Sequence, residues 1–216
     1  MNINLRARLD PAVLNRKTFD RMIRYISRFK AMNPESVDYL SEVMKAGLCK
    51  RKFKFPHHAQ GEHVETAYYI GRGYIVTYAE VRGSVHVVGI YGEDEIVGGF
   101  SFVTGQPSPY NIRIVKDTYV LAISKADLEE GCRRVKGLEE QVRLTLGGFE
   151  ARKVERLVTK NLPIEEAVLK FYGKHPGLLH SGLVPLEEIA SFLGMGRTTL
   201  AEAKGRLIEK GLLPGK

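Results

Sequence analysis

The spacing of apolar residues divides the chain into a helical beginning, a strand-rich middle and a helical end. Over residues 18–32 apolar side chains recur at steps of three or four, as on one face of a helix, and Asn33-Pro34-Glu35 then ends this helix and begins a second. Between residues 49 and 124, short strand-like runs alternate with glycine-containing turns, a spacing typical of an antiparallel barrel or jelly roll. The strands expected here are residues 66–70, 74–78, 85–90 and 119–123.

A long helix is predicted for residues 136–160, where the helical period returns. It carries an apolar stripe that one subunit would struggle to cover, so we expect the stripe to pair two subunits. The alternative is that it packs on the barrel of its own chain, and Gly147-Gly148 argues against a regular coiled coil because glycine weakens helix interiors. The residues of the stripe are Leu138, Val142, Thr145 and Phe149.

Residues 184–207 predict two short helices that meet at a glycine turn. Pro185 suits a first helical turn, two acids follow it, and Gly194 is placed to end the helix in a left-handed conformation. In the segment after the turn, apolar positions again repeat at helical spacing. Ala190, close to the turn, lets the two helices approach, which is the geometry that places the second helix of a helix-turn-helix in a DNA major groove.

The second of these helices supplies the candidate DNA-binding side chains. Arg197, near its start, is placed to bridge bidentately to a guanine. Thr199, Lys204 and Arg206 are placed to reach phosphates. The full set of candidates is Arg197, Thr198, Thr199, Ala201, Glu202, Lys204 and Arg206.

Charge does not by itself locate this segment. The chain of 216 residues has a formal net charge of +8, but residues 1–54 hold 13 basic against 5 acidic residues, whereas residues 183–216 hold 5 against 4. The basic N-terminal arm is open to three interpretations: a solvated helical face, a partner surface or an auxiliary phosphate contact.

The composition, with 44% hydrophobic and 27% charged residues, is that of an ordinary globular protein. The first residues lack the apolar run of a signal peptide, and no later stretch approaches the roughly 20 apolar residues of a membrane span, so we expect a cytoplasmic protein. Cys49 and Cys132 lie far apart, so one chain offers neither a zinc ribbon nor a four-cysteine iron-sulfur cluster. No metal and no cofactor are expected.

Two motifs carry a resemblance to a known family. One is GFSFVTGQPSPY at residues 99–110, followed by DTYVLAIS at 117–124, and the other is I-A-x-x-L-G-x-x-x-x-T-L at 189–200. Together with the order of helix, strand domain and helices, they resemble the cyclic-AMP receptor and fumarate-nitrate regulator (Crp/Fnr) superfamily, and the first motif resembles its Bacteroidetes branch. The resemblance covers most of residues 35–212.

Pattern and resemblance together imply an α+β fold. Its expected parts are an N-terminal cyclic-nucleotide-binding-like antiparallel β jelly roll with flanking helices, a long connecting and dimerisation helix, and a C-terminal helix-turn-helix domain of winged-helix-like form. The expected domains are an N-terminal helical arm at 1–33, the sensor domain at 34–135, the connecting helix at 136–160 and the helix-turn-helix domain at 161–216.

Members of this superfamily that bind cyclic nucleotides use a phosphate cassette, in which Gly-Glu holds the ribose and Arg followed by Ser or Thr holds the cyclic phosphate. At the matching positions this chain has Gly98-Gly99 and Ser108-Pro109. Losing the arginine removes about 1.5–3 kcal/mol or more of charge-assisted hydrogen bonding, so cyclic AMP is not expected to be the ligand. We interpret Arg113 as an ordinary strand residue rather than a replacement. The degenerate cassette consists of Gly98, Gly99, Phe100, Ser108, Pro109 and Tyr110.

The function implied by the resemblance is sequence-specific DNA binding in transcription regulation, without enzymatic activity. Expected partners are double-stranded DNA and a second copy of the chain. An unidentified small-molecule effector and RNA polymerase are further candidates, and no membrane partner is expected. Glu202 stands where the family often has arginine, and this change adds repulsion from phosphate while allowing acceptance from a cytosine amino group.

Two alternatives stay open. In a cupin-like metal-binding enzyme, His57, His58, Glu62 and His63 would supply ligands, since imidazole and carboxylate suit zinc, iron or nickel. In a sensor or scaffold protein, the C-terminal domain would have lost DNA binding, which the near-neutral C-terminal segment and Glu202 favour.

Overall fold

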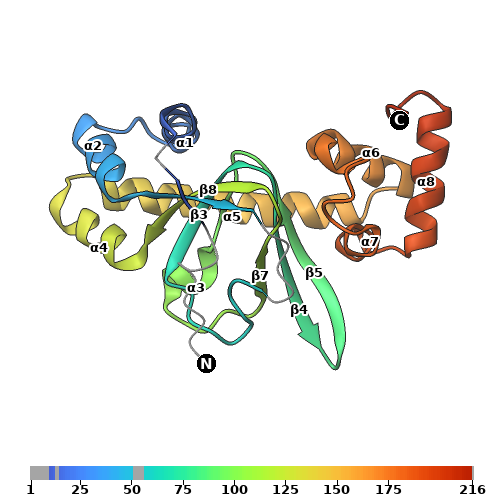
Figure 1. Ribbon diagram of the computed structural model, residues 1–216, viewed down its shortest axis with the longest axis horizontal. Helices are drawn as coiled ribbons and strands as arrows, with labels where there is room; N and C mark the ends of the chain where they lie inside the picture. The colour runs from blue at the N-terminus through green and yellow to red at the C-terminus, as the bar shows by residue number, and fades with distance from the viewer. Residues whose placement is uncertain (1–9, 13–14, 51–55, 216) are drawn as a thin grey trace.

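The structure is a computed structural model that describes residues 10–12, 15–50 and 56–215. A long helix, α5 (Leu138–Lys160), runs through the molecule beside a β-roll (Figure 1). Three helices lie at one end of α5, namely α1 (Arg16–Ser27), α2 (Pro34–Val43) and α4 (Lys125–Arg134), and three at the other, namely α6 (Ile164–Lys174), α7 (Leu186–Leu193) and α8 (Arg197–Glu209). Two shorter turns of helix are α3 (Gly99–Thr104) in the roll and η2 (Pro176–Leu178) after α6.

The β-roll consists of two antiparallel sheets. One has the strand order β1-β2-β8-β3-β6 and the other β5-β4-β7. The first is built from β1 (Asp10–Ala12), β2 (Lys45–Cys49), β8 (Thr118–Ser124), β3 (Thr66–Arg72) and β6 (Ile96–Val97). The second is built from β5 (Ser84–Tyr91), β4 (Ile75–Val81) and β7 (Asn111–Ile114).

The interior of the roll follows from the β-branched residues that its strands turn inward. Ile75 of β4 pairs with Ile114 of β7, and both are 1% exposed or less. Ile70 and Val120 are paired in the other sheet and belong to the same buried cluster. Branched side chains fit a pleated surface well, so these strands form a close-packed core.

The two N-terminal helices begin at asparagine caps. The Asn15 side chain accepts a hydrogen bond from the Thr18 N–H, and that of Asn33 accepts one from the Ser36 N–H at 2.7 Å. Such caps satisfy backbone donors that a helix start leaves unpaired. The restart of a helix at Asn33-Pro34 that the sequence predicts is therefore confirmed.

The C-terminal helices pack directly on the second sheet. Val76 and Val87 of that sheet share one buried cluster with α6, α7 and α8. At the same boundary the Val87 N–H donates to the Ser191 hydroxyl at 3.0 Å, and Arg113 of β7 pairs with Glu188 of α7. The roll and the helical domain thus meet through a continuous apolar core with polar links around it.

The four strands predicted from the sequence are confirmed as β3, β4, β5 and β8, although β4 begins at Ile75 rather than at residue 74. The segment predicted as a helical arm also contributes a strand, β1, which pairs with β2. The described residues 161–215 contain helices and turns but no strand, and they are compatible with the predicted helix-turn-helix domain. The exact domain boundaries stay a prediction.

Candidate nucleic-acid interface

Helices α7 and α8 form a close pair joined by a glycine turn. Gly194 ends α7 with φ +75°, the left-handed conformation that the sequence predicts, and the Met195 N–H donates to the Ala190 carbonyl at 3.0 Å. Pro185 caps α7 rather than lying in its first turn. The contact between the helices is made by buried side chains at helical spacing, which are Ile189, Ala190, Leu193, Leu200, Ala203 and Leu207.

The opposite face of α8 is open to solvent, at the end of the molecule remote from α1 and α2 (Figure 1). Arg197, Thr198, Ala201 and Glu202 are exposed on its first turns, and Thr199 is half-buried. The predicted DNA-binding residues at the start of α8 are thus brought together on one accessible face. A helix presented in this way has the dimensions that fit a major groove.

The basic residues Arg197 and Arg206 on α8 are paired with acids of neighbouring helices. Arg197 lies 3.1 Å from a carboxylate oxygen of Glu187, and Arg206 lies 2.9 Å from one of Glu165. Lys210 also contacts Glu165, and hydrogen bonds from Lys210 and Arg206 hold the pKa of the Glu165 carboxyl below its usual value. These exposed pairs are weak, so another anion can compete for the arginines.

Lys204 is placed differently from the other predicted phosphate contacts. Its ammonium donates to the Leu179 carbonyl and lies 5.5 Å from the centroid of the Tyr172 ring. A phosphate contact by Lys204 would require leaving both groups. The predicted role therefore fits Arg206 better than Lys204.

A large cavity, here called the interdomain cavity, lies between the roll and the C-terminal helices. Its volume is about 780 Å³, and its walls come from the roll, α3, α5, α6 and α7. Gly98, Pro109 and Tyr110 of the degenerate cassette line it. Gly98 has φ +120°, and a Cβ there would approach the Thr66 carbonyl oxygen to 2.8 Å, so only glycine fits.

The remaining cassette residues, Gly99, Phe100 and Ser108, carry no charged side chain. Ser108 is buried, and its hydroxyl donates to the Tyr110 carbonyl at 2.6 Å. Gly99 and the side chain of Phe100 lie outside the residues described in full. Arg113 pairs with Glu188 on α7, in accord with its interpretation as a strand residue rather than a phosphate ligand.

Charged and aromatic residues that the sequence analysis did not identify also line the interdomain cavity. Lys174 of α6 lies 3.3 Å from Glu95 and 3.6 Å from Glu155. The Arg156 guanidinium donates to the Val87 carbonyl at 2.9 Å and lies 4.9 Å from the Phe192 ring centroid. These residues come from segments far apart in the chain, so no local motif could have revealed them.

The apolar stripe predicted for dimerisation faces its own chain over the first half of α5. Leu138 is 1% exposed and Thr145 8%, while Val142 is half-buried. The side chain of Phe149 lies outside the described residues. The prediction that these residues form an exposed pairing stripe is therefore wrong for Leu138 and Thr145, because α1, α2 and α4 cover that face.

The histidines considered as metal ligands are engaged in hydrogen bonds. His57 Nδ1 accepts from the Ile114 N–H, His58 Nε2 lies 3.0 Å from the Tyr68 hydroxyl, and His63 Nδ1 lies 2.8 Å from the Gly105 carbonyl oxygen. The Glu62 carboxylate accepts from the Ala59 N–H. Among the described residues no three histidine, cysteine or acidic side chains cluster as a metal site, so this geometry gives the cupin alternative no support.

The roll has the fold of a cyclic nucleotide-binding domain. Residues 57–135 match the family model described as "Cyclic nucleotide-binding domain". The resemblance identified in the sequence is confirmed at this level, while its Bacteroidetes branch stays a prediction. Within the described part of the chain, no helix has the length and apolar character to cross a membrane.

Solved structures share the fold over most of the chain. A cyclic nucleotide-binding domain from Methylobacillus flagellatus is 17% identical with a TM-score of 0.63, covering 75% of this chain and 94% of that one. FixK2 from Bradyrhizobium japonicum is 18% identical with a TM-score of 0.61, covering 78% and 85%. The c-di-GMP responsive global regulator CLP of Xanthomonas campestris is 15% identical with a TM-score of 0.59, covering 85% and 96%. A comparison with curated proteins finds no match.

Proposed function

We propose that this chain is a cytoplasmic, sequence-specific DNA-binding transcription regulator of the Crp/Fnr type, and not an enzyme. The observation that carries the proposal is the α7–α8 pair, in which α7 packs on the roll while the outer face of α8 stays open. The likeness of most of the chain to the global regulator CLP supports this reading. RNA polymerase remains a candidate partner.

In this proposal α8 enters the major groove with its N-terminal residues deepest. Arg197 reads a base, and Thr199 and Arg206 contact phosphates. Glu202, exposed on the same face, repels phosphate and is placed to accept a hydrogen bond from a cytosine amino group. This combination favours modest affinity with a sequence preference of its own.

The proposed regulator is a homodimer that pairs through the second half of α5. Val154, Leu157 and Val158 are each at least 50% exposed on that part of the helix. A second copy would cover these side chains and place two α8 helices on half-sites about one helical turn, or roughly 34 Å, apart.

The interdomain cavity is the proposed effector site, and its ligand is not cyclic AMP. Gly99 and Ser108 stand where a carboxylate and a guanidinium would hold the nucleotide. Calorimetry with cyclic AMP and cyclic GMP should give no measurable heat of binding, and micromolar affinity for either would overturn this part of the proposal.

Selection of bound sequences from a random double-stranded library, followed by gel shifts with the full chain, tests DNA binding. A symmetric or nearly symmetric operator is expected. Glu202→Arg should raise affinity for unrelated DNA, because a repulsive charge is replaced by an attractive one. If neither the parent chain nor Glu202→Arg binds any duplex, the sensor or scaffold alternative replaces this proposal.

A further inference from the structure

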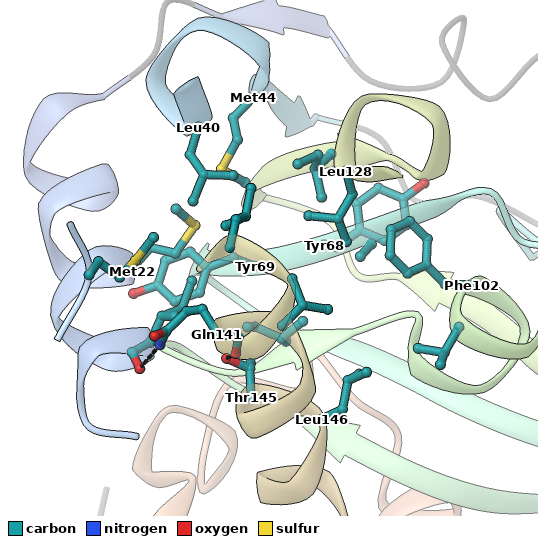
Figure 2. A pocket seen from close by; sticks show the side chains of 18 residues that line it. Met22, Leu40, Met44, Tyr68, Tyr69, Phe102, Leu128, Gln141, Thr145 and Leu146 are labelled. Carbon is teal, nitrogen blue, oxygen red and sulfur yellow. Dashed lines mark hydrogen bonds between the residues drawn. The ribbon is translucent and has the colours of Figure 1, made fainter. Parts of the chain in front are cut away.

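A second, smaller cavity adjoins the interdomain cavity on the side of α1 and α2, and we call it the apolar cavity. It has a volume of about 110 Å³ and lies where α1 and α2 meet the β3–β8 face of the roll and the first half of α5 (Figure 2). Met22 and Leu40 come from the N-terminal helices, Phe102 from α3 and Leu146 from α5. Ile96, Val103 and Leu146 line both cavities, whereas the residues from α1, α2, α4 and β8 line the apolar cavity alone.

The lining of the apolar cavity is almost entirely hydrocarbon and thioether. Its polar side chains are already engaged: Gln141 Nε2 donates to the Ile26 carbonyl at 2.8 Å, and the Thr145 hydroxyl donates to the Gln141 carbonyl at 2.8 Å. The Tyr68 hydroxyl is bonded to His58, and that of Tyr69 donates to Asp94. A charged or strongly polar ligand would lose its hydration here without compensation.

The size of the apolar cavity sets the size of an occupant. Apolar cavities of about 150 Å³ stay dry and bind benzene, and a volume of about 110 Å³ is of the same order. Met22, Met32 and Met44 contribute to the lining, and methionine adapts readily to the shape of an apolar guest because its side chain is unbranched and polarizable. One aromatic ring or a short branched alkyl group fits these dimensions.

The cavity is closed on one side by contacts between α1 and α5. Lys30, just after α1, pairs with Glu140, and Gln141 holds the Ile26 carbonyl. The Phe29 ring lies against Gly148, where a Cβ would approach it to 2.5 Å, so this glycine allows the close approach. These contacts keep the N-terminal helix over a space that its own side chains do not fill.

We propose that the apolar cavity is a binding site for a small uncharged apolar molecule of about the size of one aromatic ring. Binding there fills empty space between α1, the roll and α5 and so favours the folded chain over the unfolded one. The inference does not depend on DNA binding.

Thermal unfolding of the full chain with near-saturating benzene tests the site, with phenol at the same concentration as the polar comparison. Benzene should raise the unfolding temperature by about 2 °C or more, and phenol should raise it less. Val142→Phe places a ring from α5 into the cavity, so this variant should lose the benzene shift. Val85→Phe makes the same substitution on the exposed β5 strand and should keep it.

Three results would contradict the proposed binding site. Absence of a benzene shift in the parent chain, an equal shift with phenol, or a shift that persists in Val142→Phe would overturn the proposal. If Val142→Phe fails to fold, Ala67→Val fills less of the same cavity and should still reduce the benzene shift below that of Val85→Phe. An unreduced shift in Ala67→Val then counts against it equally.

Discussion

Two consecutive acids at the start of α7 form ion pairs in very different surroundings. Glu188 pairs with Arg113 of the roll, and these side chains are 23% and 19% exposed. Glu187 pairs with Arg197 of α8, and these side chains are 59% and 67% exposed. One face of α7 is therefore held firmly against the roll, and the other is loosely paired with the proposed DNA-binding surface.

The surroundings of the two ion pairs also differ in how tightly they are packed. Around Glu188 the boundary is dense: Ser191 accepts from the Val87 N–H, and the Arg156 guanidinium covers the Phe192 ring. Around Glu187 the neighbouring residues of α8 are solvated. Buried pairs are costly to break, while exposed pairs contribute little, so the inner face of α7 should govern stability and the outer surface should govern DNA binding.

The largest expected effect on stability concerns His175, which lies where the C-terminal helices face the roll. This ring is buried beside Tyr74 and Phe171, and burial, together with the charge of Lys174, lowers its pKa from 6.5 to about 4. The unfolded chain binds a proton between these two values while the folded chain does not. The contribution of neutral His175 to the free energy of unfolding is therefore fully present above pH 6.5. The free energy of unfolding should fall by about 3 kcal/mol as the pH approaches 4.

Urea unfolding at a series of pH values measures this loss. His175→Gln should remove most of the pH dependence between 6.5 and 4, whereas His86→Gln, at an exposed position of β5, should leave it in place. An unchanged slope in His175→Gln would show that another group carries the titration.

The second-largest expected effect on stability concerns the ion pair between Arg113 and Glu188. Glu188→Ala leaves the Arg113 guanidinium without its carboxylate at a largely covered boundary, and we expect a loss of about 1.5–3 kcal/mol in the free energy of unfolding. Chemical denaturation measures it, and a double-mutant cycle with Arg113→Ala isolates the pair. Independent, additive effects of the two substitutions would mean that the pair does not hold α7 to the roll.

On the exposed side, around Arg197, we expect substitutions to change the affinity for DNA rather than the free energy of unfolding. Arg197→Ala should weaken binding to the selected operator by about 1–3 kcal/mol and relax its sequence preference, because an arginine at the start of α8 reaches base edges. Arg206→Ala should weaken all sequences alike and flatten the salt dependence. Equal operator affinity for Arg197→Ala and the parent chain would remove α8 as the reading helix and direct attention to the basic segment between residues 6 and 30.

The features that the sequence could predict are those that depend on local patterns. The strands, the restart at Asn33 and the turn at Gly194 depend on short-range patterns and caps, and the structure contains all of them. The exposed start of α8 followed from helical spacing alone. Local physics is sufficient for such features because each depends on a few neighbouring residues.

The orientation of α5 could not be predicted in this way. Helical spacing identifies the stripe containing Leu138 but does not say whether a second copy or α1 covers it, and the answer depends on Phe29 meeting Gly148 across more than a hundred residues of sequence. Lys204 shows the same limit, since its inward bond to Leu179 depends on where η2 and its neighbours pack. The walls of both cavities are likewise products of long-range packing.

The smallest expected effect is that of the acid beside Arg197. Glu187→Ala removes one exposed ion pair, so the free energy of unfolding should change by no more than about 0.5 kcal/mol, in contrast to the neighbouring Glu188→Ala. The same change releases the Arg197 guanidinium and removes a negative charge near the phosphates, so operator affinity should rise slightly, most clearly at low salt. Gel shifts at two salt concentrations and one denaturation curve measure both quantities. A loss of operator affinity in a fully stable Glu187→Ala would mean that Glu187 orients Arg197 for base contact rather than competing with DNA for it.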